Sequence, residues 1–102
     1  VQHKYELFAG TSNTLDAATD YIAYCNTAAG AVTLNLPAMA SCPAGTVFVI
    51  KDNGSAGTNN ITISPDSSDK IDHLADNADL VLSQNFAAVT LISNGDTGWM
   101  II

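Results

Sequence analysis

The chain has 102 residues, a mass of 10.6 kDa and a formal charge of −7, from ten acidic and three basic residues. This length corresponds to one domain with its own hydrophobic core. Because affinity for nucleic acid depends on lysine and arginine, a chain with three lysines and no arginine is excluded as a nucleic-acid binder. No apolar run approaches the about 20 residues of a transmembrane helix, so membrane insertion is not expected.

Alternating apolar and polar residues, the pattern typical of strands, recur along the whole chain. The predicted strands cover residues 4–8, 21–25, 31–36, 46–50, 60–64, 79–82, 87–92 and 99–102. Pro37 ends one of them, because proline cannot donate a hydrogen bond to a sheet. Helical periodicity is nearly absent, and only residues 14–20 predict a single helical turn, capped by Thr14.

Turn residues separate the predicted strands at short intervals. Residues 28–30 predict a tight hairpin, and Asn-Gly at residues 53–54 and 94–95 tolerates the positive φ of hairpin turns. Short strands with such turns predict an all-β fold, a single compact antiparallel β-sandwich or barrel-like domain of about eight strands. We expect residues 14–102 to form this domain and residues 1–13 to be an N-terminal arm or a first strand. Val1 is compatible with removal of an initiator methionine and also with a fragment of a longer protein.

Three predicted strands are apolar on both faces, at residues 46–50, 87–92 and 99–102. Such strands lie between two layers or at a subunit contact. Closed symmetry would also protect the sheet edges, which this chain blunts with few lysines. We therefore expect a homo-oligomer whose contact surface includes Val47, Val49, Trp99, Met100 and Ile102. Packing in the core is the alternative for Trp99.

Two groups of side chains could form a covalent link or bind a metal. Cys25 and Cys42 are the only cysteines, and they are compatible with one disulfide or with two buried thiols. Two cysteines are too few for a transition-metal site of Cys-x-x-Cys type. Asp66, Asp69 and Asp72 are candidate ligands of a hard cation, although they lack the spacing of an EF-hand. A solvated acidic loop is the alternative.

No combination of residues points to catalysis. A serine hydrolase needs a base beside its nucleophile, but the only histidines are His3 and His73 and there is no G-x-S-x-G motif. Asp72 and His73 are adjacent, so on a strand they would face opposite sides. No pair of carboxylates is marked as the buried acid and base of a glycosidase. We expect neither enzymatic activity nor a cofactor.

The order of the segments provides a further indication of function. It runs through residues 18–22, 26–30, 31–37, 45–52, 59–63, 70–72, 89–93 and 98–102. This order and spacing resemble the small all-β module of bacteriophage tail-fibre and virion-surface proteins, from about Asp16 onward. Cys25 and Met100 depart from the aliphatic and aromatic residues expected at their positions.

The resemblance implies a non-enzymatic, trimeric module on the virion surface. Its partners would be other virion proteins, such as a major capsid or fibre protein, and its role would be head decoration or part of a fibre. One alternative is the receptor-binding tip of a tail fibre, with Tyr5, Tyr21, Tyr24 or Trp99 contacting a host surface glycan. Another is a subunit of an extracellular filament that donates residues 1–13 as a strand to its neighbour.

Overall fold

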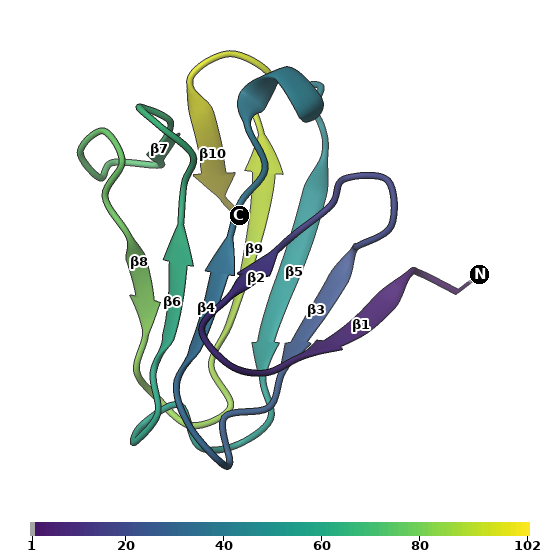
Figure 1. The fold of residues 1–102 in the computed structure, drawn as a ribbon. Helices are drawn as coiled ribbons and strands as arrows, with labels where there is room; N and C mark the ends of the chain where they lie inside the picture. Colours follow the sequence, from purple (N-terminus) through teal and green to yellow (C-terminus); the bar gives the residue numbers. More distant parts are fainter. Residues whose placement is uncertain (1) are drawn as a thin grey trace.

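Two β-sheets packed face to face form the framework of the computed structural model, which describes residues 2–102 (Figure 1). Val1 lies outside the described residues. The strands are β1 (Tyr5–Phe8), β2 (Asn13–Thr14), β3 (Ile22–Cys25), β4 (Val32–Asn35), β5 (Val47–Asp52), β6 (Ile61–Ser64), β7 (Lys70–Ile71), β8 (Leu80–Leu82), β9 (Ala88–Ser93) and β10 (Gly98–Ile101), and η1 (Met39–Ser41) is a 3-10 turn. Residues 2–102 contain no α-helix, which confirms the all-β class with ten strands rather than about eight.

The chain winds repeatedly from one sheet to the other. The six-stranded sheet has the order β1-β3-β5-β9-β10-β7, and the four-stranded sheet has the order β2-β4-β6-β8. The first six strands alternate between the sheets, so β1, β3 and β5 run parallel, as do β2, β4 and β6. Later strands complete the sheets: β8 and β9 run antiparallel to β6 and β5, β10 is antiparallel to β9, and β7 is parallel to β10.

The prediction of an antiparallel sandwich is therefore wrong in strand direction. One-sided burial gives the same alternation in parallel and antiparallel strands, so periodicity does not separate the two. The turn at residues 28–30 is not a hairpin but carries the chain from β3 to β4 in the other sheet, and the Asn53-Gly54 turn likewise leads from β5 to β6. Of the three predicted hairpins, only the Asn94-Gly95 turn joins antiparallel neighbours, β9 and β10.

The N-terminal segment belongs to the sheets. β1 pairs in parallel with β3 over its whole length, and Asn13 begins β2, so this segment supplies strands of the domain. The predicted helical turn is present as a short turn after β2, in which the amide of Asp20 donates to the carbonyl of Asp16 at 2.9 Å. Asp16 caps this turn through a 2.8 Å hydrogen bond from the amide of Ala18, whereas Thr14 lies in β2.

The hydrophobic core lies between the two sheets and is built from alternate positions of their strands. Phe48 and Trp99 contact each other there, with ring centroids 5.4 Å apart. Trp99 is only 1 % exposed, so it is a core residue and is removed from the predicted contact surface. Full burial of a large apolar side chain contributes about 1.5–3 kcal/mol to stability. The largest buried side chains beside these two are Leu15, Leu34, Ile50, Ile61, Ile63, Ile71, Leu91 and Val32.

Candidate assembly surface

The outer side of the six-stranded sheet is largely apolar. Residues paired across neighbouring strands point to the same side of a sheet. The register therefore groups Tyr5, Ile22, Val49 and Thr90 in one row, Leu7, Tyr24, Lys51 and Ala88 in a second, and Val47, Ile92 and Met100 in a third. Ile102 continues beyond β10 on the same side. We call these twelve residues the outer apolar face.

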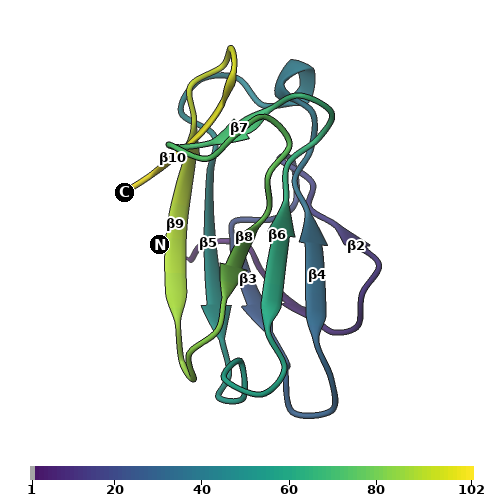
Figure 2. The same ribbon diagram turned by 90° about the vertical axis from the view of Figure 1, so that its left-hand side faces the viewer.

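Every side chain of this face is exposed or half-buried, with residues 2–4 beside Val47 and Phe86 beside Lys51. Figure 2 shows the two layers from the side, with the C-terminal end of the chain emerging on the outer side of the six-stranded sheet. Four of its large apolar side chains are exposed, and most of the others are half-buried by their neighbours alone. The exposed four are Tyr5, Leu7, Met100 and Ile102.

Four of the five predicted contact residues, Val47, Val49, Met100 and Ile102, lie together on the outer apolar face. The fifth, Trp99, points to the opposite side of the sheet. The remaining apolar members of the face, Tyr5, Leu7, Ile22, Tyr24 and Ile92, were not predicted. Their signal in the sequence is the strand alternation: Leu7, Ile22, Tyr24 and Ile92 each lie next to a buried strand residue and so point away from the core, and Tyr5 lies two residues before Leu7 on the same side of β1.

The outer side of the four-stranded sheet has a different composition. Its outward positions are Thr14, Thr33, Asn35, Thr62, Ser64 and Val81. Hydroxyl and amide groups of this kind hydrogen-bond to water, so this sheet can face solvent. The two sheets therefore differ in what their outer sides require: one is suited to water, and the other exposes apolar side chains.

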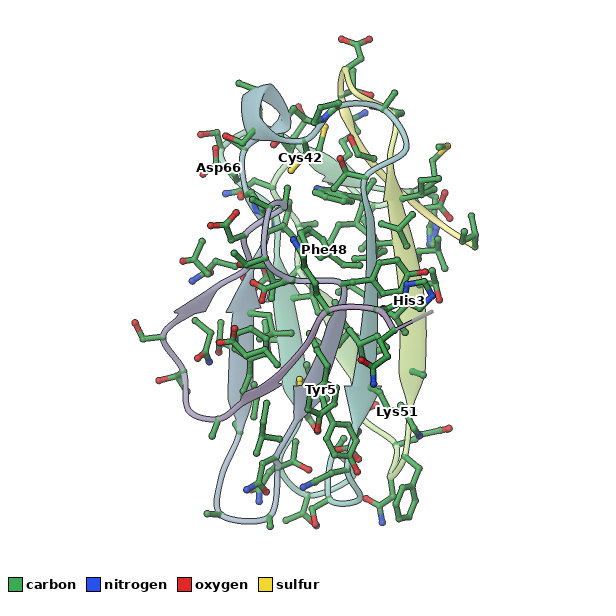
Figure 3. All side chains as sticks on the ribbon, turned by 90° about the vertical axis from the view of Figure 1, so that its right-hand side faces the viewer. His3, Tyr5, Cys42, Phe48, Lys51 and Asp66 are labelled. Atoms are coloured by element: carbon green, nitrogen blue, oxygen red, sulfur yellow. The ribbon has the colours of Figure 1, made fainter. Side chains whose placement is uncertain are left out.

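Lys51 is the only charged member of the outer apolar face. Its ammonium group donates a hydrogen bond to the carbonyl of Phe86 and lies 5.4 Å from the centroid of the Phe86 ring. Two acidic residues lie on strands of this sheet, on the side opposite the outer apolar face: Asp52 is buried and Glu6, on the edge strand, is exposed. The other acidic residues lie on turns and loops. Figure 3 shows Phe48 between the two layers and Lys51 on the outer side of the six-stranded sheet.

A buried carboxylate, Asp52, fixes three loops at one end of the domain. It is fully buried at the end of β5, and its Oδ1 accepts a 2.5 Å hydrogen bond from the Thr27 hydroxyl. Its Oδ2 accepts hydrogen bonds from the amides of Gly54, Ala56 and Phe86 at 3.0, 3.0 and 2.9 Å. Burial alone would raise the pKa of Asp52, but these four hydrogen bonds outweigh it and hold the pKa below its ordinary value. Asp52 is therefore structural, and we call this cluster the Asp52 hub.

The two cysteines are free thiols at opposite ends of β5. Cys25 is the sheet partner of Asp52, the last residue of β5. Cys42 lies near the start of β5: its carbonyl accepts a hydrogen bond from the Ser93 hydroxyl, and the Ser93 amide donates to the carbonyl of Thr46, just before the strand begins. Six strand residues span about 20 Å, and a disulfide requires Cα atoms within about 7 Å. The two thiols therefore do not form the disulfide that the sequence left open. Burial and the charge of Asp52 raise the pKa of the Cys25 thiol to about 12, and burial also raises that of Cys42.

The candidate cation ligands do not form a site. Residues 2–102 contain no group of three histidine, cysteine or acidic side chains placed to hold a metal, so Asp66, Asp69 and Asp72 are not brought together. Burial raises the pKa of Asp69, and the charge of Asp66 adds to this effect. The backbone amide of Met39 acts in the opposite direction. Asp72 lies in a turn after β7 rather than on a strand, and its carboxylate is 3.7 Å from the imidazole Nδ1 of His73.

A carboxyl pair connects the edge strand β1 to the turn before β3. Glu6 points toward Asp20, which is 7 % exposed and whose Oδ1 has no hydrogen-bond partner in the structure. The other oxygen, Oδ2, accepts a hydrogen bond from the amide of Asp16 at 2.9 Å. The charge of Asp20, and to a smaller extent burial, raise the pKa of Glu6. The charge of Asp20 therefore makes ionisation of Glu6 less favourable.

The sequence matches no protein-family model and no curated protein. No helix within residues 2–102 has the length and hydrophobicity needed to cross a lipid bilayer.

Proposed function

We propose that this chain is a non-enzymatic structural protein of a bacteriophage virion, a β-rich trimeric module that decorates or stabilises the capsid or forms part of a fibre. The observation that carries this proposal is the outer apolar face, which an acidic domain presents on one sheet only. A protein whose work is to make contacts needs such a surface, held on a rigid framework.

The roles of the reactive side chains support a structural function. All four hydrogen bonds of the Asp52 carboxylate go to loop residues of its own chain, and the Cys25 thiol has a pKa too high for a nucleophile at neutral pH. His3 stacks on the ring of Tyr21 with centroids 4.4 Å apart, and His73 lies beside Asp72 on the surface. Each of these groups serves the fold or faces solvent.

Immunogold electron microscopy of virions whose genome encodes this chain tests the proposal. An antibody against the folded domain should label particles, and the label should lie regularly over the capsid or at the fibres. Intact virions that contain none of the protein by mass spectrometry, and carry no label, would contradict the proposal. The location of the label separates decoration of the capsid from a role in a fibre.

A second candidate function, binding of a host surface glycan, is favoured by the aromatic side chains at one end of the outer apolar face. The rings of Tyr5 and Tyr24 lie 6.0 Å apart, and Phe86 is exposed beside Lys51. Exposed aromatic rings provide flat apolar surfaces on which sugar rings can stack. Binding on a glycan array that Tyr5→Ala abolishes would support this candidate, whereas an array without signal would exclude it for the glycans tested.

The filament alternative has less support. β1 pairs along its whole length with β3 of its own chain, so the N-terminal segment is already used within the domain. Donation of this strand to a neighbour would require its release.

A further inference from the structure

We propose that the outer apolar face is the surface on which a second copy of this chain docks. This inference rests on the proposed structural function, to which it adds the contact surface and its occupant. Two observations support it, the composition of the face and the distribution of charge over the chain, and the size of the face sets the expected strength of the contact.

The composition of the face matches that of a protein contact. Interface centres are enriched in tyrosine and methionine and depleted of charged residues. The face carries Tyr5, Tyr24 and Met100 among aliphatic side chains, with a single charge.

The distribution of charge favours a second copy as the occupant. Each chain carries a formal charge of −7, so two copies repel each other over most of their surfaces. The outer apolar face holds none of the ten carboxylates, and two copies that meet there bury none of them. A basic partner would instead dock on the acidic loops. A second copy supplies by construction an equally apolar and uncharged surface.

The size of the face sets the expected strength of docking. Five strands about 4.8 Å apart and about 16 Å long give a footprint of about 400 Å². Two such footprints bury about 800 Å² in total, which is below the about 1,000 Å² of a stable specific interface and corresponds to a weak, transient contact. We therefore expect weak association of isolated chains, dependent on concentration in the micromolar to millimolar range. A closed ring, in which each copy has two neighbours, would strengthen it.

Sedimentation equilibrium of matched variants tests this inference. Met100 on the outer apolar face is 41 % exposed, and Val81 on the outer side of the other sheet is 47 % exposed. Both are outward strand residues, so Met100→Glu and Val81→Glu add the same charge at similar exposure. The wild-type mass should rise with concentration toward a multiple of the monomer. Met100→Glu should weaken this association at least about tenfold, because a carboxylate would be buried without a partner, whereas Val81→Glu should change it little.

A second matched pair probes the centres of the two sheets. Val49 on β5 and Thr62 on β6 are both half-buried outward residues, so Val49→Glu should also weaken association and Thr62→Glu should not. Thermal unfolding by circular dichroism identifies variants that fail to fold, and only folded variants are compared. Met100 is exposed, so its variant keeps the test valid if Val49→Glu unfolds.

Three results would overturn the inference. A wild-type chain that stays monomeric to millimolar concentration would do so, and so would equal weakening by Met100→Glu and Val81→Glu. Binding of a glycan to the monomer that Met100→Glu abolishes would show that the face binds sugar instead. Failure of the proposed function is distinguishable from failure of this inference. If virions lack the protein, the proposed function fails, but the self-association measured in solution is unaffected.

Discussion

Replacement of the Asp52 carboxylate by its amide should destabilise the domain strongly. Asp52→Asn keeps the size of the side chain, so it creates no cavity, and it changes only charge and hydrogen bonding. Oδ2 accepts hydrogen bonds from the amides of Gly54, Ala56 and Phe86, and Oδ1 accepts one from Thr27. The amide of asparagine can keep its oxygen toward the three N–H groups, but its NH₂ group would then face the Thr27 hydroxyl.

The expected loss follows from these four hydrogen bonds. A hydrogen bond to a charged group contributes about 1.5–3 kcal/mol, and such contributions do not add within one cluster. Asparagine retains weaker, uncharged versions of some of the bonds, so we expect Asp52→Asn to lower the free energy of unfolding by about 2–4 kcal/mol. For a domain of this size that loss corresponds to a fall in Tm of about 10–25 °C.

Urea denaturation followed by circular dichroism measures this loss, with Asp96→Asn as the control. Asp96 is exposed in the turn between β9 and β10, so its variant makes the same charge change and should stay within about 0.5 kcal/mol of wild type. Because the folded-state pKa of Asp52 is depressed, its stabilisation is present above the ordinary value of 3.8 and is lost as pH falls through the lowered pKa. Asp52→Asn should lack this part of the acid dependence. Equal stability of the two variants would refute the structural role of the hub.

Three further predictions concern the packing and the titratable groups. Gly98→Ala should lower the free energy of unfolding, measured by urea denaturation, by at least about 1–3 kcal/mol, because a Cβ would lie 2.0 Å from the Lys70 carbonyl oxygen of β7. Gly30→Ala is the control, since a Cβ there meets nothing within 4 Å, and equal stability of the two variants would contradict the close approach. Glu6 is the only glutamate, so a labelled glutamate carboxyl gives one NMR resonance, which should titrate above the ordinary 4.5 and fall toward it in Asp20→Asn. Since that pKa is raised, stabilisation by the pair is present in acid and is lost as pH rises through it; a wild-type titration at the ordinary value would contradict the pair. The Cys25 thiol should resist a thiol reagent at mildly alkaline pH until the chain is unfolded, and rapid modification of the native protein would show that it is not buried as described.

The sequence predicted the positions of most strands but not their directions. Alternation in residues 31–36 and 60–64 located β4 and β6, because one side of each strand faces the core. Their parallel pairing depends on turns that cross between the sheets, and the residues of those turns resemble those of hairpins. β2 and β7 have two residues each and are defined by their partners in the sheet, so no local pattern predicts them.

The outer apolar face was predicted in part. Val47, Val49, Met100 and Ile102 were identified because their strands are apolar on both sides, and the structure places them on one face. Trp99 was assigned to the wrong side, since a strand that is apolar throughout does not show which alternate residues face the core. Its pairing with Ile71, which is buried, settles that question.

The Asp52 hub was not predicted because its parts are distant in the sequence. Thr27 and Phe86 lie 25 and 34 residues from Asp52, and only the fold brings their loops together. One signal was present: Asp52 continues the buried phase of Phe48 and Ile50 along β5. An acidic residue in that phase must find hydrogen-bond donors, because an unpaired buried carboxylate is too costly.

The two methionines of the chain report whether copies meet through the outer apolar face. Met100 lies on the face, whereas Met39 lies in η1 and packs against the core, with its sulfur 3.6 Å from the Ser93 hydroxyl oxygen. In methyl NMR spectra recorded from micromolar to millimolar concentration, the Met100 methyl should shift and become shielded from a paramagnetic agent in the solvent, while the Met39 methyl stays constant. A Met100 methyl that remains equally accessible at every concentration would contradict the claim.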